Sequence, residues 1–179
     1  EIARTAKRFG AEVPFLRPEK LATDTATTLS VLQHALKEYE RVSGKKFSHA
    51  LLLQPTTPLR TSQDIDRAVR LMAKQRSKDA LISCYYGEGV LPLIMYTARS
   101  GRNTLFVPVP KEMTRRQNFE KVYVRNGAIY LIPRELLLKG QMIGKNPLIM
   151  EMPRWRSINI DNPEDFELAR IILKYGKKN

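Results

Sequence analysis

Two polar segments of the sequence carry side chains suited to chemistry at the ends of sheet strands. The first is the loop Gln54–Arg60, which follows the apolar run Ala50–Leu53. The second is Ser157–Asp161, where alternation along a strand would place Asn159 and Asp161 opposite two isoleucines. Ligands of open α/β sheets bind beyond the carboxyl ends of the strands. A carboxylate there suits Mg²⁺, which takes oxygen donors and shares them with substrate phosphates. The alternative is that Asp161 helps to cap the next helix.

A third candidate group combines the basic pair Arg115–Arg116 with the tripeptide Arg125–Gly127. Arginine offers a planar fork of donors that matches carboxylate and phosphate geometry. Gly127, without a side chain, would let the backbone approach a ligand closely. The structural alternative is a solvated basic surface next to a β-bulge.

The elements that must position these residues alternate between strand and helix. Apolar periodicity and capping residues predict helices over 1–9, 25–43, 61 onward, 133–138 and 162 onward. Strands are expected over 11–16, 50–53, 79–86, 91–97, 104–107, 122–132, 148–152 and 157–160. This alternation predicts an α/β fold with a mainly parallel sheet. The unbroken apolar run 50–53 indicates a strand buried on both faces. The helix-free range 85–109 is expected to form a small antiparallel flap.

Composition limits the broad class of the protein. The chain has 179 residues, of which 42% are hydrophobic, and this fits one globular domain and excludes disorder, collagen and coiled coil. No apolar run is long enough to span a bilayer. A single cysteine, Cys84, allows no internal disulfide, so we expect a cytoplasmic protein. The net charge of +13 favours anionic partners. Nucleic acid is the alternative that charge alone suggests, but no nucleic-acid-binding signature is present.

Five motifs together resemble those of the CMP-sialic acid synthetases, also called acylneuraminate cytidylyltransferases. They occur in family order and are Arg17–Thr25, Leu53–Arg60, Arg116–Gln117, Asn126–Tyr130 and Ile158–Phe166. The resemblance spans nearly the whole chain and implies a Rossmann-like nucleotide-diphospho-sugar transferase fold. It implies a nucleotidyltransferase that couples CTP to a nine-carbon 2-keto sugar acid of sialic, legionaminic or pseudaminic type and releases pyrophosphate. The resemblance also favours binding and catalytic roles for these residues over a helix cap at Asp161 and a solvated basic surface around Arg116.

The resemblance implies a role for each matching residue. Asp161 and Asn159 match catalytic positions that hold Mg²⁺ or Mn²⁺. The positions that match nucleotide contacts are Arg17, Asp24, Thr28 and Asn126. The positions that match sugar contacts are Gln54, Arg116, Tyr130, Met142 and Ile143. The resemblance further implies a homodimer in which the flap 85–109 helps to form the partner's sugar site, with neither nucleic acid nor membrane as a partner.

The sequence departs from the family pattern at several positions. Asn159 stands where the family has an aspartate, which predicts weaker metal binding because an amide carries no charge. Val124 replaces a frequent arginine. Met142 and Ile143 stand where aromatic residues often line the acyl pocket, which favours a modified sugar acid of the legionaminic type.

The family's N-terminal strand and its Gly-rich, basic triphosphate loop have no counterpart before Glu1. We therefore expect a truncated chain that is inactive or severely impaired alone. Two alternatives remain open. One is a synthetase for an eight-carbon sugar acid (the CMP-KDO type), although that family usually carries an acidic residue in the loop matching Gln54–Arg60. The other is a degenerate, non-catalytic homologue that binds nucleotide.

Overall fold

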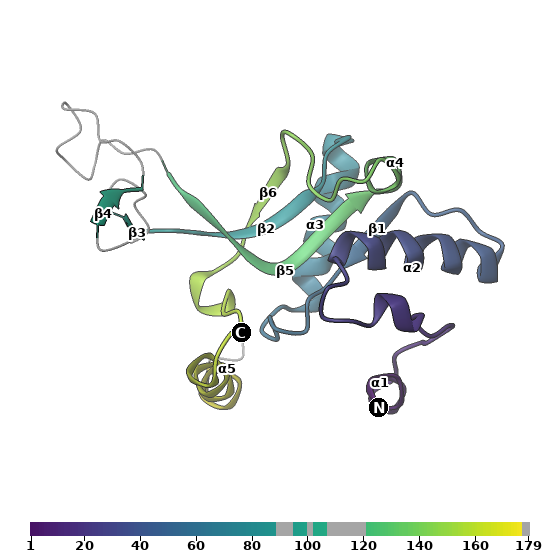
Figure 1. Ribbon diagram of the computed structural model, residues 1–179, viewed down its shortest axis with the longest axis horizontal. Helices are drawn as coiled ribbons and strands as arrows, with labels where there is room; N and C mark the ends of the chain where they lie inside the picture. Colours follow the sequence, from purple (N-terminus) through teal and green to yellow (C-terminus); the bar gives the residue numbers. More distant parts are fainter. Residues whose placement is uncertain (89–94, 100–101, 107–120, 177–179) are drawn as a thin grey trace. The chain divides into compact units, whose positions relative to one another are not determined.

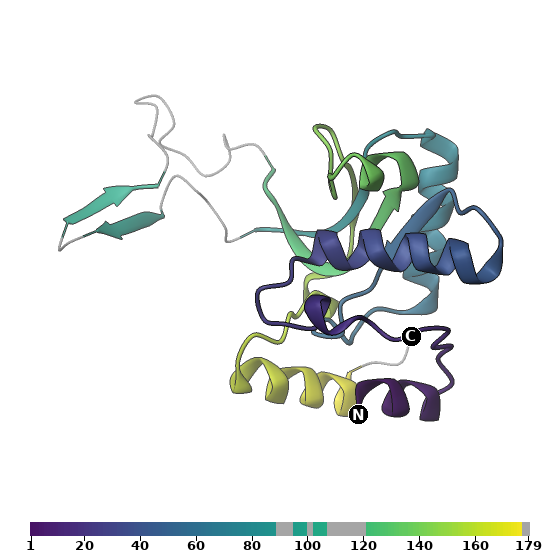
Figure 2. The same cartoon turned by 45° about the vertical axis from the view of Figure 1, so that its right-hand side comes forward.

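The computed structural model describes residues 1–88, 95–99, 102–106 and 121–176. One sheet contains four strands, in the order β1 (His49–Leu52), β5 (Tyr123–Pro133), β2 (Leu81–Tyr86) and β6 (Leu148–Glu151) (Figure 1). A separate antiparallel pair consists of β3 (Tyr96–Arg99) and β4 (Arg102–Leu105) (Figure 2). The α-helices are α1 (Ile2–Arg8), α2 (Thr28–Ser43), α3 (Ser62–Gln75), α4 (Arg134–Leu138) and α5 (Pro163–Tyr175).

Strand β1 differs from the prediction made for residues 50–53. It stands at the end of the strand order and runs antiparallel to β5, with Leu52 opposite Tyr130. It is also not buried on both faces, because Leu51 is 37% exposed. An apolar run of four residues is compatible with either pairing, so its lack of alternation did not determine the direction of the strand.

Strands β2 and β6 run parallel. The Leu148 N–H donates to the Ala80 carbonyl at 2.9 Å, and the Met152 N–H donates to the Cys84 carbonyl at 2.7 Å. These bonds advance by the same number of residues on both strands, as in a parallel pair. The α/β class is therefore confirmed, and its sheet is mixed.

Helix ends follow the local sequence signals closely. Gly44 ends α2 in the left-handed conformation, with φ of 67°. Thr61 and Asp64 form the expected capping box, in which the Thr61 N–H donates to the Asp64 carboxylate at 2.8 Å. Asn162 caps α5 by accepting the Asp165 N–H at 2.9 Å. Each signal needs only residues within one turn, so the sequence predicts it well.

Two expected strands are wrong. Residues 11–16 lie outside helices and strands, since Pro14 supplies no backbone donor to a ladder. Residues 157–160 follow the 3₁₀ helix η4 (Arg154–Arg156) and are also not a strand. The flap at 85–109 stays a prediction, because 89–94, 100–101 and 107–109 lie outside the described residues.

The chain divides into two compact units. The first comprises Glu1–Leu53, Ile65–Ile82 and Ile129–Leu148, and the second comprises Gln54–Asp64, Ser83–Ala128 and Ile149–Asn179. The first unit has a core of Leu36, Ala80, Ile132, Leu136 and Leu137, where α2 packs against β1 and α4.

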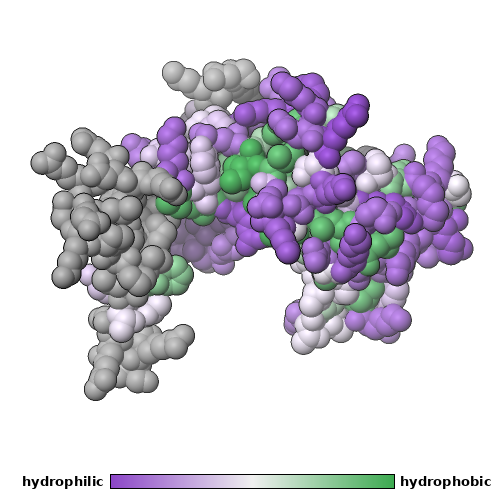
Figure 3. Space-filling model, turned by 90° about the horizontal axis from the view of Figure 1, so that it is seen from above, coloured by the Kyte–Doolittle hydropathy of each residue, from purple (hydrophilic) through white to green (hydrophobic). Residues whose placement is uncertain are grey.

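In the second unit, α5 buries less of its apolar face than its periodicity predicts. Ala169 is 2% exposed, but Phe166 is 55% and Leu173 is 62% exposed. On the face drawn in Figure 3, hydrophilic side chains surround the smaller hydrophobic areas.

Within the described ranges, no helix combines the length and the apolar character that a membrane crossing requires.

Candidate active site

The loop Gln54–Arg60 is closed on itself by hydrogen bonds. The Gln54 carbonyl accepts from the Thr57 hydroxyl at 3.0 Å and from Nη1 of Arg60 at 2.8 Å. The same Arg60 nitrogen donates to the Thr57 carbonyl at 2.9 Å. Burial lowers the pKa of the Arg60 guanidinium. The loop has two prolines and no regular structure, and these bonds fix its shape instead.

This loop lies against β5 at the Asn126–Gly127 motif. Gly127 has φ of 76°, and a Cβ built there would lie 2.5 Å from Oε1 of Gln54. Nη1 of Arg60 also lies 3.5 Å from the Ala128 carbonyl. Gly127 is therefore needed for its backbone conformation and for the space that the Gln54 side chain takes.

The loop also holds the segment 157–161. The Ile160 N–H donates to the Thr56 carbonyl at 2.8 Å. A single backbone bond replaces the ladder that a strand would make, which is why the expected strand is absent. Three motifs that lie far apart in the sequence thus meet within the second unit.

The 3₁₀ helix before this segment is anchored by an ion pair. The Arg156 guanidinium donates to both carboxylate oxygens of Asp64, at the start of α3. Burial alone would raise the pKa of Asp64, but hydrogen bonds from Arg156 and Thr61 outweigh it and hold that pKa below its usual value. The ion pair fixes where residues 157–161 begin.

Asp161 is exposed, and its carboxylate faces Asn159. Nδ2 of Asn159 lies 2.7 Å from each carboxylate oxygen. The backbone N–H of Asp161 donates to the Asp165 carboxylate at 3.1 Å, while Asn162 caps α5. Asp161 therefore contributes to the start of α5 through its backbone N–H, whereas its carboxylate is not part of the cap.

The donors here fit only part of a metal coordination shell. Asp161 supplies one carboxylate, and Asn159 turns its nitrogen toward it. Among the described residues, no group of three His, Cys, Asp or Glu side chains could hold a metal ion. One carboxylate still suits a Mg²⁺ ion shared with nucleotide phosphates, because Mg²⁺ keeps several waters and takes one or two protein carboxylates.

Asn126 lies inside the second unit and is 3% exposed. Its amide oxygen accepts from the Ser83 hydroxyl at 2.6 Å, and its nitrogen donates to the Ser157 hydroxyl at 2.8 Å. Sequence reasoning missed both serines. A hydroxyl at position 83, within the apolar run that begins β2, was the one available signal for Ser83, because a buried hydroxyl needs a hydrogen-bond partner.

Tyr130, Met142 and Ile143 belong to the first unit. Tyr130 and Met142 are partly buried against its core, and the Ile143 carbonyl accepts the Ala80 N–H at 2.9 Å. A Cβ at Gly144 would collide with the Asp79 carboxylate, so the backbone after Ile143 passes close to the start of β2.

The nucleotide candidates of the first unit are on its surface. Arg17, Asp24 and Thr28 are all exposed, and Nη1 of Arg17 donates to the Leu21 carbonyl at 3.3 Å. Thr28 is the first residue of α2. Arg116 lies outside the described residues.

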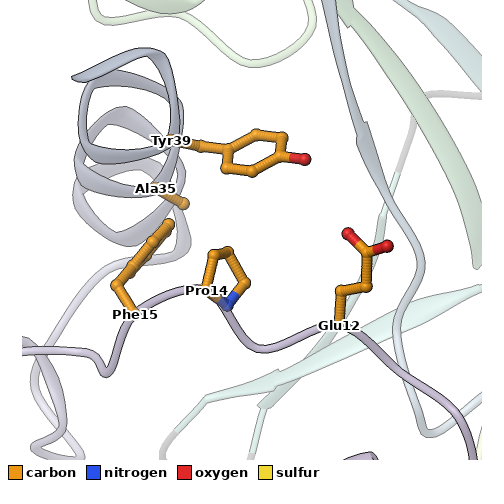
Figure 4. A pocket seen from close by; sticks show the side chains of 5 residues that line it. All are labelled: Glu12, Pro14, Phe15, Ala35 and Tyr39. Atoms are coloured by element: carbon orange, nitrogen blue, oxygen red, sulfur yellow. The ribbon is translucent and has the colours of Figure 1, made fainter. Parts of the chain in front are cut away.

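A cavity of about 350 Å³ in the first unit contains none of these candidates. Figure 4 shows Ala35 and Tyr39 of α2 on one side and Glu12, Pro14 and Phe15 on the other. None of the residues that line this cavity belongs to the three motifs of the second unit.

Comparison with known proteins finds several relatives along nearly the whole chain. Post-translational flagellin modification protein B of Campylobacter coli is 29% identical over 97% of this chain and 73% of that protein. An N-acylneuraminate cytidylyltransferase of Escherichia coli O18:K1:H7 is 31% identical over 97% of this chain, which spans 39% of that protein. A CMP-N,N'-diacetyllegionaminic acid synthase of Legionella pneumophila is 26% identical over 99% of this chain and 76% of that protein. No protein-family model matches.

Proposed function

We propose that this chain, which is similar along nearly its whole length to cytidylyltransferases of sialic, legionaminic and pseudaminic acids, transfers the CMP group of CTP to a nine-carbon 2-keto sugar acid. The anomeric hydroxyl of the sugar acid attacks the α-phosphorus of CTP. The new oxygen–phosphorus bond forms as the bond to pyrophosphate breaks, and the hydroxyl proton is released. No covalent enzyme intermediate is needed, so the protein acts by alignment and by neutralising phosphate charge.

One observation supports this proposal above the others. The Gln54 loop, the Asn126–Gly127 pair of β5 and the segment ending in Asp161 are joined by direct hydrogen bonds and contacts. Gln54, which matches a sugar contact, and Asp161, which matches a metal ligand, therefore lie in the same unit of the fold.

We assign the remaining roles from the family motifs. Gln54, Tyr130 and Arg116 are proposed to bind the sugar acid, with Arg116 paired to its carboxylate. Met142 and Ile143 are proposed to contact its acyl groups and to favour a legionaminic-type acid. Arg17, Asp24 and Thr28 are proposed to hold the nucleotide. Asn126 also matches a nucleotide contact, but it is 3% exposed and its amide is bonded inside the protein, so we assign it no such contact.

A divalent cation, Mg²⁺ or Mn²⁺, is proposed to reach the site with the triphosphate and to be held by Asp161, beside Asn159. When bound, it would neutralise phosphate charge and lower the pKa of the attacking hydroxyl. The part that the chain itself plays is to place one carboxylate at the phosphate end of the site.

We also propose a cytoplasmic homodimer. Cys84 is buried and has no second cysteine to pair with, and this fits a reducing compartment. The range 85–109 is proposed as the dimer flap, and its β3–β4 hairpin supports that role.

The test is a turnover assay of the purified protein with CTP, a divalent cation and one sugar acid at a time. We expect pyrophosphate release and a CMP-sugar of the corresponding mass with legionaminic, sialic or pseudaminic acid, and none with an eight-carbon acid. Preference for the eight-carbon acid would support the CMP-KDO-type alternative. Absence of turnover with all of the acids, both in this chain and in a chain extended at its N-terminus by the family's Gly-rich, basic loop, would overturn the proposal.

A non-catalytic homologue is the second candidate, and the Asn159 amide favours it. This amide occupies both oxygens of Asp161 and removes one negative charge that the family usually supplies. Such a protein would bind CTP without releasing pyrophosphate, so calorimetric titration with CTP beside the turnover assay separates the two functions.

A further inference from the structure

The buried Asn126 side chain has no hydrogen-bonding capacity left for a ligand. Its oxygen accepts from the Ser83 hydroxyl at 2.6 Å and from the Ala128 N–H at 3.1 Å. Its nitrogen donates to the Ser157 hydroxyl at 2.8 Å and more weakly to the Met152 sulfur at 3.6 Å. An amide offers two acceptor sites and two donors, and all four are used inside the protein.

The direction of this network is fixed by its chemistry. The Ala128 N–H is a backbone donor and can only face an acceptor, so the amide oxygen of Asn126 must lie on that side. The Ser157 hydroxyl then accepts from the amide nitrogen and donates its own proton to the Pro153 carbonyl at 3.0 Å. Flipping the amide would set donor against donor at Ala128.

The hydrogen bonds of Asn126 connect two strands and the segment that ends in Asp161, all of which belong to the proposed site. Ser83 belongs to β2, Asn126 to β5, and Ser157 opens the segment that ends in Asp161. Next to Asn126, Gly127 lies against the Gln54 side chain. A shift of the Asn126 amide would therefore move the Gln54 contact and the Asp161 segment together.

We propose that Asn126, held by Ser83 and Ser157, is a positioning residue that sets the spacing between Gln54 and Asp161 and does not itself contact substrate. The proposal rests on the proposed function, because its main readout is turnover. Its consequence is that two serines with no substrate contact affect the chemical step.

The main experiment compares Ser83→Ala, Ser157→Ala and the double variant, with Ser62→Ala at an exposed position of α3 as the matched control. We expect each single variant to lower kcat about tenfold at unchanged KM for both substrates (within about twofold). The double variant should lose little more than either single variant, because both serines act through the same amide. The control should retain the full rate, and Ser157→Thr, which keeps the hydroxyl, should recover most of it.

Three outcomes would overturn the proposal: an unchanged kcat in folded single variants, multiplying losses in the double variant, or a rise confined to KM for CTP or for the sugar acid. The last would mean that Asn126 binds that substrate directly. If neither the unmodified protein nor its N-terminally extended form gives turnover, the proposed function fails instead, and the variants are not needed to show it.

A second measurement needs no variant and remains decisive if the alanine variants do not fold. The side-chain amide of Asn126 gives its own ¹⁵N–¹H resonances in the unmodified protein. We expect these to stay in place, and to exchange slowly with solvent, when CTP or N-acetylneuraminic acid is added at saturation. A large shift confined to this amide would assign it a direct contact and contradict a positioning role.

Discussion

At the scale of single residues, a substitution at position 159 tests whether the negative charge beside Asp161 sets the affinity of the site for a divalent cation. Asn159→Asp restores a second carboxylate beside Asp161, whose two oxygens now face the Asn159 nitrogen at 2.7 Å. We expect tighter binding of Mn²⁺ in the presence of CTP, by about tenfold, because a carboxylate adds charge and an oxygen donor. Electron paramagnetic resonance of free Mn²⁺ measures this directly. Weaker binding would show that Asn159 has another task, and Asp161→Ala, which should leave only the Mn²⁺ that CTP binds without protein, is the control.

Gly127 provides a second test at this scale, with a matched glycine elsewhere in the chain. Gly127 and Gly140 have φ of 76° and 78°, but a Cβ at Gly140 would meet nothing within 4 Å. Alanine at either position should lower the free energy of unfolding by about 1–2 kcal/mol, since the left-handed conformation is strained for L-residues. Only Gly127→Ala should also lower turnover, because only there does the new methyl group displace Gln54. Equal turnover of the two variants, beside urea unfolding curves, would contradict this role for the contact.

At the scale of elements, Glu40 connects α2 to the start of α4. Its carboxylate accepts from Arg134 at 2.7 and 3.1 Å and from Lys46 at 3.0 Å. Hydrogen bonds from Arg134 and then Lys46 lower the pKa of Glu40 from 4.5 to about 2. The unfolded chain therefore binds this proton at higher pH than the folded chain does. The stabilisation is complete above about pH 4.5 and is lost as the pH falls toward 2.

The predicted result is a urea midpoint that declines from pH 5 to pH 2.5 more steeply in the unmodified protein than in Glu40→Gln. Other carboxylates titrate in the same range, so the difference between the two proteins is the quantity to compare. Glu135→Gln is the matched control, since Glu135 also contacts Arg134, at 2.9 Å, but lies at the surface. Parallel curves for the unmodified protein and Glu40→Gln would show that the ion pair does not stabilise the fold.

Elements also show which parts of the fold a sequence can predict. Gly44, Thr61 and Asn162 mark helix ends correctly because caps depend on neighbours within a turn. The direction of β1 and the exposure of Leu51 were wrong because both depend on the partner strand. Within the site, the motifs singled out Gln54, Asn126 and Asp161, whose segments meet in the second unit. They could not predict that the Asn126 amide is consumed by Ser83 and Ser157, since those contacts join residues 43 and 31 positions apart.

At the scale of the whole molecule, the positive net charge is compatible with a small anionic substrate or with a polyanion such as DNA. The effect of salt on each kind of binding separates the two. The chain carries 31 Lys and Arg against 18 Asp and Glu. A positive field of this kind raises the rate at which anionic substrates arrive, and salt screens it. We expect KM for CTP to rise several-fold between about 0.05 and 0.5 M NaCl while kcat stays constant, because the screening length falls from roughly 14 to 4 Å over that range. Sucrose at matched osmolality is the control and should change neither constant.

The affinity of the protein for DNA distinguishes the proposed enzyme from a nucleic-acid-binding protein. Basic residues that only attract a small anion need not be arranged along the path of a DNA backbone. The dissociation constant for random duplex DNA should therefore lie in the non-specific range, about 10⁻⁴–10⁻⁶ M at physiological salt. Fluorescence anisotropy of labelled DNA measures this, and the DNA should inhibit turnover only at low salt. Submicromolar binding at physiological salt, with a steep salt dependence, would mean that the surplus of 13 positive charges serves a polyanion. A KM for CTP that is insensitive to NaCl would show that the charge has no part in substrate capture.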